Sequence, residues 1–232
     1  MGKLEELVEI ANPQQPHVAT VLLLDTSGSM SGSKINQLNE GLKSFQKAVL
    51  DDELARKRVD LAVVTFDDEV NIVHNFSPVE EFDPPILEAI GLTSMGGAIL
   101  RAIELVEQRK SEYKTKGIDY YRPWIFMITD GEPTDMQLGD PMWNEVVKKV
   151  HEGEANKKFL FFAVGVEPAN MVLLTHIAPQ KREPVKLKTG KFKEMFEWLS
   201  KSQARVSASM VGEQVVLDSP VGPKGWGEIS TV

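Results

Sequence analysis

The sequence lacks cysteine altogether, and this absence excludes several kinds of chemistry at once. None of its 232 residues carries a thiol, so disulfide bonds, thiolate metal ligation and cysteine-based catalysis are unavailable. No apolar run approaches the roughly 20 residues that a membrane-spanning helix needs. The opening stretch, MGKLEELVEI, lacks a signal-peptide core, and Glu6 stands where a myristoylation signal has Ser or Thr. We therefore expect a cytoplasmic protein with no membrane partner.

Positive charge and histidine are also scarce. The chain has 26 Lys and Arg residues against 34 Asp and Glu residues, a formal net charge of −8. This balance argues against a strongly basic surface that binds nucleic acid. The histidines at positions 17, 74, 151 and 176 form no cluster and show no H-E-x-x-H spacing. We therefore expect neither a nucleic-acid partner nor an imidazole-bound zinc ion.

Apolar residues, in contrast, are frequent enough for one compact domain. They make up 42% of the chain, and α/β chains of this length commonly form a single unit. We expect a lead-in over residues 1–16, the domain itself over 17–206, and an extension over 207–232 that packs on the domain.

The apolar residues are arranged as alternating strands and helices. Runs of strand length lie at 18–24, 59–66, 124–129 and 159–166, and segments with helical spacing lie at 35–50, 98–106, 143–150 and 192–199. This alternation predicts an α/β fold with a mostly parallel central sheet and helices on both faces. The polar turn Asp67-Asp68-Glu69 links 59–66 to 70–76 as a hairpin, which predicts one antiparallel edge strand.

Oxygen-bearing side chains follow two of these strands. The segment Asp25-Thr26-Ser27-Gly28-Ser29 comes directly after 18–24, and Asp130 follows 124–129. In parallel sheets, ligands bind beyond the carboxyl ends of the strands, so the two carboxylates are expected to meet. Thr93 lies in the loop before the helix at 98–106 and is a third candidate. Carboxylate and hydroxyl oxygens suit a hard cation such as Mg²⁺.

These motifs resemble those of the von Willebrand factor A-domain family. In that family, a metal-ion-dependent adhesion site combines a D-x-S-x-S loop, a distant Thr and a T-D-G loop. The resemblance implies a single Rossmann-like domain and assigns the metal to Asp25, Ser27, Ser29, Thr93 and Asp130. Leu92 stands where the family often has Gly before the Thr. The expected metal is Mg²⁺, with Mn²⁺ or Ca²⁺ as alternatives, and its open position would take an Asp or Glu carboxylate from a protein partner.

A narrower resemblance is carried by S-G-S-M-S-G-S-K-I-N-Q-L-N-E-G-L, T-D-G-E-P-T-D and F-F-A-V-G-V-E-P-A-N-M. These stretches are similar to the bacterial TerY-like group, which is associated with tellurium resistance. The resemblance implies a role in stress-response signalling, with kinases or phosphatases as partners. Some members of the wider family exchange direct and water-mediated metal contacts between the Thr and the third-loop Asp. Such an exchange between Thr93 and Asp130 is a hypothesis here.

Simpler interpretations remain for each motif. D-T-S-G-S and Asp130 are also typical of turns, and Thr93 is also suited to capping the following helix. Ser31 and Lys34 match S-x-x-K without the motifs that accompany a serine-lysine nucleophile. Asp135, in the third loop, is expected to hold that loop through hydrogen bonds without binding the metal. The basic residues between 181 and 193 are expected to lie on a solvated surface, with an acidic partner as the alternative.

Two other functions compete with partner binding. A metal-assisted phosphoesterase would use a metal-bound water, but no histidine lies in the three loops to act as a base. A structural scaffold would use the metal only to stabilise the loops. We expect no enzymatic activity and assign no catalytic residue.

Overall fold

The sheet is built from strands that are buried along nearly their whole length. The computed structural model describes residues 10–229 of the chain. Every residue of β1 (Val18–Asp25), β2 (Val59–Phe66) and β4 (Trp124–Thr129) is buried. β5 (Leu160–Gly165) is buried except at two partly exposed positions. Such continuous burial requires cover on both faces, as the sequence predicted.

Seven strands form one sheet in the order β3-β2-β1-β4-β5-β6-β7. β1, β2, β4, β5 and β6 (Val185–Leu187) run parallel, and β3 (Val70–Pro78) pairs antiparallel with β2, which confirms the predicted edge hairpin. A further short strand, β7 (Gly227–Glu228), pairs antiparallel with β6 at the opposite edge. The sequence did not predict it, because two residues show no alternation.

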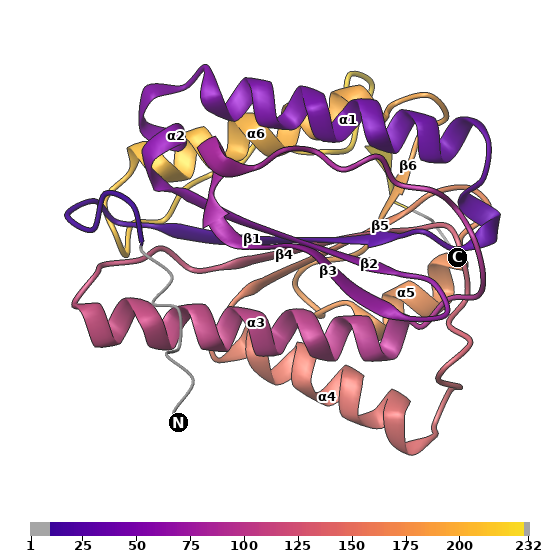
Figure 1. Cartoon of the computed structure of the whole chain (residues 1–232). Helices are drawn as coiled ribbons and strands as arrows, with labels where there is room; N and C mark the ends of the chain where they lie inside the picture. The colour runs from indigo at the N-terminus through magenta and orange to yellow at the C-terminus, as the bar shows by residue number, and fades with distance from the viewer. Residues whose placement is uncertain (1–9, 230–232) are drawn as a thin grey trace, which may run out of the picture.

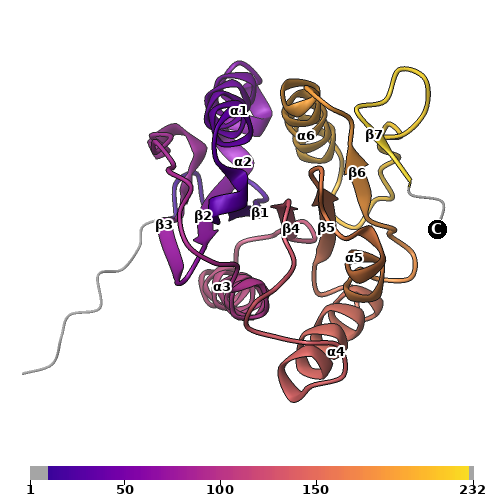
Figure 2. The same ribbon diagram turned by 90° about the vertical axis from the view of Figure 1, so that its right-hand side faces the viewer.

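Helices cover both faces of the sheet (Figure 1, Figure 2). One face carries α1 (Ser33–Leu50), α2 (Glu53–Arg58) and α6 (Phe192–Ala208), and the other carries α3 (Met95–Lys116), α4 (Pro141–Ala155) and α5 (Met171–Ile177). Short 3-10 turns, η1 (Gly28–Met30) and η2 (Val79–Glu81), complete the fold. The four predicted helices are present, and α3 is much longer than its apolar stripe.

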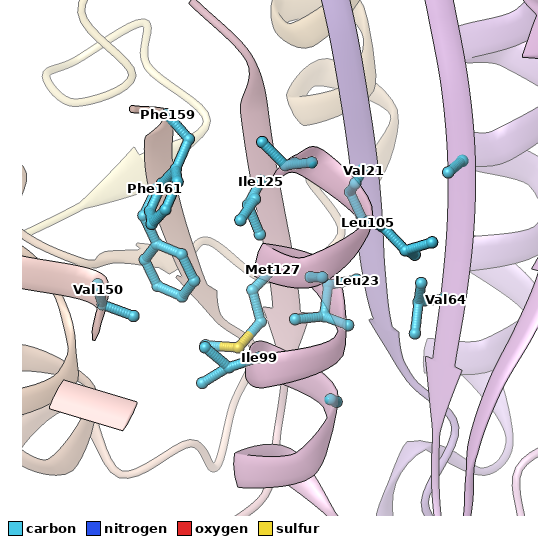
Figure 3. Close-up of a cluster of buried hydrophobic side chains, with 14 of the residues drawn as sticks. Val21, Leu23, Val64, Ile99, Leu105, Ile125, Met127, Val150, Phe159 and Phe161 are labelled. Atoms are coloured by element: carbon cyan, nitrogen blue, oxygen red, sulfur yellow. The ribbon is translucent and has the colours of Figure 1, made fainter. Parts of the chain in front are cut away.

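Two apolar cores hold the layers together, one on each side of the sheet. Figure 3 shows part of the core beneath α3, where Ile99 and Leu105 pack against Val21, Leu23, Ile125 and Met127 of the sheet. Each such side chain contributes roughly 1.5–3 kcal/mol when it is fully buried. The core therefore fixes β1 and β4 side by side, and with them the loops that follow.

The order in which strands are added to the sheet reverses at β1 and β4, although the two strands are parallel. From β1 the chain crosses to β2 on one side, whereas β4, β5 and β6 follow on the other side. Such a switch point leaves a crevice at the carboxyl ends of the two central strands. The register pairs Leu24 with Ile128, so Asp25 and Asp130 leave the sheet within one residue of each other.

Candidate metal centre

The first loop folds so that its oxygen atoms gather above β1. Asp25 is fully buried; its Oδ1 accepts a 2.8 Å hydrogen bond from the Ser27 amide, and its Oδ2 accepts a 2.5 Å bond from Thr129 Oγ1. Ser27 Oγ lies 2.9 Å from Ser29 Oγ. The intervening Thr26 turns away and donates to Asp67 Oδ2 at 3.0 Å. The side chains of residues 25, 27 and 29 therefore lie on the same side of the first loop, as their spacing at alternate positions of the sequence suggested.

The third loop brings Asp130 to the same place. Its carboxylate is 2% exposed, and its Oδ1 accepts a 2.6 Å hydrogen bond from Ser29 Oγ, 101 residues earlier in the chain. The other oxygen, Oδ2, forms an ion pair with Lys34 Nζ. Ser27, Ser29 and Asp130 thus form a continuous line of oxygen atoms across two loops.

Thr93 completes the cluster from the second loop. It is 5% exposed, and it exchanges hydrogen bonds with Thr134 of the third loop: its amide donates to Thr134 Oγ1 at 3.1 Å and its carbonyl accepts from the Thr134 amide at 2.9 Å. A Cβ at Gly131 would meet Thr93 Oγ1 at 3.1 Å and Asp25 Oδ2 at 3.6 Å. The absence of a side chain at Gly131 therefore lets the second and third loops close over Asp25.

Helix capping, the alternative role for Thr93, is taken by other residues. The cap position of α3 is Ser94. The free amides of Gly96 and Gly97 donate to Asp135 Oδ1 and Oδ2 at 3.0 and 2.8 Å. Asp135 therefore ties the third loop to the start of α3, as its expected supporting role requires.

The acidic hairpin turn also supports the second loop. Asp68 Oδ1 accepts a hydrogen bond from the Leu92 amide at 3.0 Å, and the carbonyl of Asp67 accepts one from the Ser94 amide at 2.8 Å. Gly91 has φ +70°, and a Cβ there would lie 2.3 Å from Asp68 Oδ2. Glycine is required at this position, and the turn braces Thr93.

The electrostatics of the cluster favour an added cation. Burial raises the pKa of Asp25 despite its hydrogen bonds, and the negative charge of Asp130 adds to the increase. Two buried carboxylates thus lie close together, and Lys34 is the ammonium that contacts one of them. The donor set consists of carboxylate and hydroxyl oxygens, which hard divalent cations prefer. The residues present therefore fit Mg²⁺, with Asp25, Ser27, Ser29, Thr93 and Asp130 as the group that would hold it.

Two residues of the cluster were not predicted from the sequence. Lys34 was noted only within S-x-x-K, yet its ammonium contacts Asp130 and donates to the Glu167 carbonyl at 3.3 Å. Thr129 was expected only as a strand end, yet it orients Asp25. A lysine at the second position of the helix that follows the first loop was the available signal for Lys34. Within residues 10–229, no group of three or more His, Cys, Asp or Glu side chains is arranged to hold a metal, so a cation here would need oxygen ligands besides the carboxylates, and the hydroxyls of Ser27, Ser29 and Thr93 are available.

The sequence comparison agrees with this geometry. The sequence-family model of the von Willebrand factor type A domain matches residues 20–198. The chain belongs to this family. Domains of the family are commonly protein-interaction or adhesion modules and generally not enzymes. The match begins in β1 and ends in α6, so it contains all three loops.

Two proteins that are similar to this chain in sequence are much longer than it is. Human inter-alpha-trypsin inhibitor heavy chain H4 is 29% identical over 150 residues, which are 61% of this chain and 15% of that protein. The pig protein of the same name is 30% identical over 149 residues, with the same shares. The chain therefore spans about 15% of the length of the curated relatives it matches.

Solved structures share the fold at low identity. A von Willebrand factor type A protein from Catenulispora acidiphila superimposes with a TM-score of 0.60 at 16% identity, covering 83% of this chain and 43% of that one. The corresponding domain of the type V pili tip protein Mfa5 from Porphyromonas gingivalis gives 0.59 at 12% identity, covering 87% and 99%. These similarities confirm the predicted α/β domain. No helix within residues 10–229 is long and apolar enough to cross a membrane.

Proposed function

We propose that this chain is a metal-dependent protein-binding module that captures an Asp or Glu carboxylate of its partner through a metal-ion-dependent adhesion site. The observation that carries this proposal is the convergence of two buried carboxylates and three hydroxyls from three separate loops at the switch point of the sheet. Family membership supports the binding class of function.

Each residue has a role that follows from its contacts. Asp25, Ser27 and Ser29 would hold the cation from the first loop, Thr93 from the second and Asp130 from the third. Mg²⁺ is the proposed cation, with Mn²⁺ or Ca²⁺ as alternatives. Hydroxyl ligands are neutral, so the cation would keep enough positive charge to attract a further carboxylate. Ser29 is exposed, which leaves this side of the cluster open to a partner.

The arrangement of the carboxylates argues against the metal-assisted hydrolase. Asp25 accepts hydrogen bonds from the Ser27 amide and Thr129 Oγ1, and Asp130 accepts from Ser29 and Lys34. A general base needs a free lone pair within reach of its proton donor. Each carboxylate keeps lone pairs beyond these hydrogen bonds, but the proposed cation would take them, so neither carboxylate would be left to act as a base. We therefore favour binding over catalysis.

The cellular role is proposed on motif resemblance. S-G-S-M-S-G-S-K and T-D-G-E-P-T-D support a TerY-like role in bacterial stress-response or tellurite-resistance-associated signalling, in the cytoplasm, with a kinase or phosphatase as partner. Two solved chains with this fold are a pilus adhesin and a pilus tip protein, which agrees with recognition as the general function.

Calorimetric titration with Mg²⁺, Mn²⁺ and Ca²⁺ tests the site directly. The wild-type protein is expected to bind at least one of these ions, and Asp25→Ala is expected to abolish that binding. Asp51→Ala is the matched control, because Asp51 is an exposed carboxylate at the far end of α1. Circular dichroism of all three proteins checks that the fold is kept.

A pull-down from the source cell then tests the partner. Capture is expected with Mg²⁺ and not with EDTA, and Asp25→Ala is expected to lose the cation-dependent part. Undiminished capture by a folded Asp25→Ala protein would exclude the proposed mechanism. Equal capture in EDTA would favour the scaffold, and metal-dependent phosphoester turnover that is lost in Asp25→Ala would favour the hydrolase.

A further inference from the structure

A second possible site lies at the other end of the sheet. A cavity of about 750 Å³ opens where β4 and β5 begin, between the last turns of α3 and the segment 206–217, which comprises the end of α6 and the residues after it. In Figure 1, β4 begins toward the left-hand end of the molecule, whereas the loops that follow β1 and β4 lie toward the right. The six residues of β4 separate the two ends by about 20 Å, at 3.3 Å per residue. We call this cavity the basic cavity.

The charge of the basic cavity is opposite to that of the chain as a whole. Its wall contains one acidic residue, Glu213, and six cationic residues: Lys110, Lys114, Arg122, Lys157, Lys158 and Arg182. The chain has a net charge of −8. A concave surface that gathers one sign of charge concentrates counter-ions of the other sign. The cavity is therefore suited to an anion.

Two arginines at this site are incompletely neutralised. Arg122 Nη2 and Arg182 Nη2 lie 3.2 and 3.4 Å from the same oxygen, Glu154 Oε1. Each Nε is buried and without a hydrogen-bond partner among the described residues. Burial lowers the pKa of Arg122, and the charge of Arg182 adds to this lowering although Glu154 opposes it. One carboxylate thus serves two guanidinium groups, and an anion in the cavity would supply the negative charge that Glu154 alone does not.

The wall of the cavity is held in place by specific contacts. Arg182 stacks on Phe162, with its guanidinium carbon 4.5 Å from the ring centre. Tyr121 Oη donates a 2.6 Å hydrogen bond to the Ser209 carbonyl, and Arg205 Nη1 donates to the Val216 carbonyl at 2.9 Å. These contacts fix both ends of the 206–217 segment. The basic cavity is therefore preformed, which reduces the entropy lost on binding.

The basic cavity is distinct from the run of basic residues at 181–193 as a whole. Lys186 pairs with Glu167, Lys191 with Glu194, and Lys188 donates to the carbonyls of Gly222 and Gly225. Arg182 alone from this run reaches the cavity wall. The expected solvated surface therefore describes most of the run, and Arg182 is the exception.

We propose that the basic cavity binds a small, multiply charged phosphate-bearing anion. Guanidinium groups match phosphate oxygens in pairs, and lysines supply mobile point charges around them. The volume lies within the range of small-molecule sites. A free polyphosphate and a nucleoside triphosphate share this chemistry. The proposal does not depend on the metal centre.

Calorimetric titration of the full chain tests this proposal. Sodium tripolyphosphate and ATP are added separately in EDTA buffer, so that no cation at the metal loops attracts them. Binding of either ligand supports the proposal. Tighter binding of ATP identifies a nucleotide as the ligand, and equal binding identifies the polyphosphate group alone. Binding of neither overturns the proposal.

Variants locate the binding. Arg182→Gln is expected to weaken binding about tenfold, with circular dichroism as the check on folding. Lys114→Gln combined with Lys158→Gln removes two exposed charges of the cavity and is expected to weaken binding without disturbing the fold. Lys43→Gln combined with Lys193→Gln makes the same charge change outside the cavity. Equal losses in the two double variants, or equally tight binding of a poly-glutamate peptide, would overturn a specific phosphate site.

Discussion

At the scale of single residues, Lys34 sets the charge balance of the candidate metal centre. Its ammonium pairs with Asp130, whose side chain is fully buried, while 23% of the Lys34 side chain stays exposed. The two carboxylates of the cluster are thus partly neutralised before any cation arrives. A divalent cation held by Asp130 would lie within a few ångströms of this ammonium, and the two positive charges would repel.

Replacing this lysine is therefore expected to strengthen metal binding. Lys34→Met keeps the length of the side chain and removes its charge. Two unit charges about 4 Å apart interact by roughly 4 kcal/mol at an effective dielectric of about 20, and the double charge of the cation raises this to roughly 8 kcal/mol. Partial exposure of Lys34 reduces this considerably. We expect the dissociation constant for Mg²⁺ to fall by roughly threefold to tenfold, measured by calorimetry.

The control for this variant lies on the same helix. Lys43→Met removes an exposed lysine that pairs with Glu40, and its Mg²⁺ affinity is expected to equal that of the wild type. Unchanged or weaker binding in Lys34→Met would show that the ammonium does not oppose the cation.

The site residues differ in how far the sequence alone could place them. Asp25 and Asp130 follow apolar strands, so their meeting follows from a parallel sheet. Thr93 lies in a loop whose position depends on contacts with Asp68 and Thr134; its place before a predicted helix made it a candidate, and the family pattern assigned it to the metal. Lys34 and Thr129 were missed as members of the cluster, because their contacts with Asp130 and Asp25 cross about one hundred residues of chain and leave no local spacing.

At the scale of elements, the start of α3 couples the second and third loops. Asp135 accepts hydrogen bonds from the amides of Gly96 and Gly97 in the first turn of this helix, and Thr93 lies two residues before the helix begins. The same loop caps a second helix, since Asp140 accepts from the Trp143 amide at 2.7 Å at the start of α4. The two aspartates perform similar local tasks at different distances from the metal centre.

This pair allows capping and site support to be separated. Asp135→Ala and Asp140→Ala are each expected to lower the free energy of unfolding by about 1 kcal/mol, the usual cost of a lost helix cap, measured by urea denaturation. Only Asp135→Ala is expected to weaken Mg²⁺ binding, because it frees the third loop from α3. Equal metal affinity in both variants would contradict a supporting role for Asp135.

A helix or strand could be predicted from the sequence when its own residues show the apolar spacing typical of that element. β2 and β4 match the predicted bounds because most of their residues are apolar and β-branched or aromatic, although β2 also contains Asp60 and Thr65. α3 extends to Lys116 through polar residues that favour helix and ends at Gly117, whose φ is +67°. β6 and β7 are only three and two residues long. Such short segments show no pattern of their own, and they are strands only because they pair with residues that are distant in sequence.

At the scale of the whole molecule, a buried charged cluster joins the sheet to α3. Asp60, at the start of β2, is 1% exposed; its Oδ2 accepts hydrogen bonds from Arg109 Nη2 at 2.7 Å and Tyr113 Oη at 2.5 Å, and His17 Nδ1 lies 3.2 Å away. Burial alone would raise the pKa of Asp60, but the adjacent His17 and the charge of Arg109 outweigh it, and the pKa is lowered.

The lowered pKa of Asp60 makes the stability of the whole fold sensitive to acid. Its ordinary pKa is 3.8, and the folded protein holds it below that value. Above pH 3.8 the stabilising contribution of the ionised carboxylate is present in full. As the pH falls below 3.8 the unfolded chain takes up the proton first, so the contribution decreases until the pH has passed through the folded-state pKa.

Asp60→Asn tests this linkage through urea denaturation between pH 7 and pH 2. At pH 7 the variant is expected to lose roughly 3–5 kcal/mol, because the buried Arg109 loses its ion pair with Asp60 and retains only the partly exposed Glu112 as a partner. Below pH 4 its free energy of unfolding is expected to fall less steeply than that of the wild type, since the carboxylate that binds the proton is gone. Asp218→Asn, which removes an exposed carboxylate paired with Arg205, is expected to stay close to the wild type at pH 7. Parallel acid slopes for wild type and Asp60→Asn would show that the buried cluster does not control the acid stability of this fold.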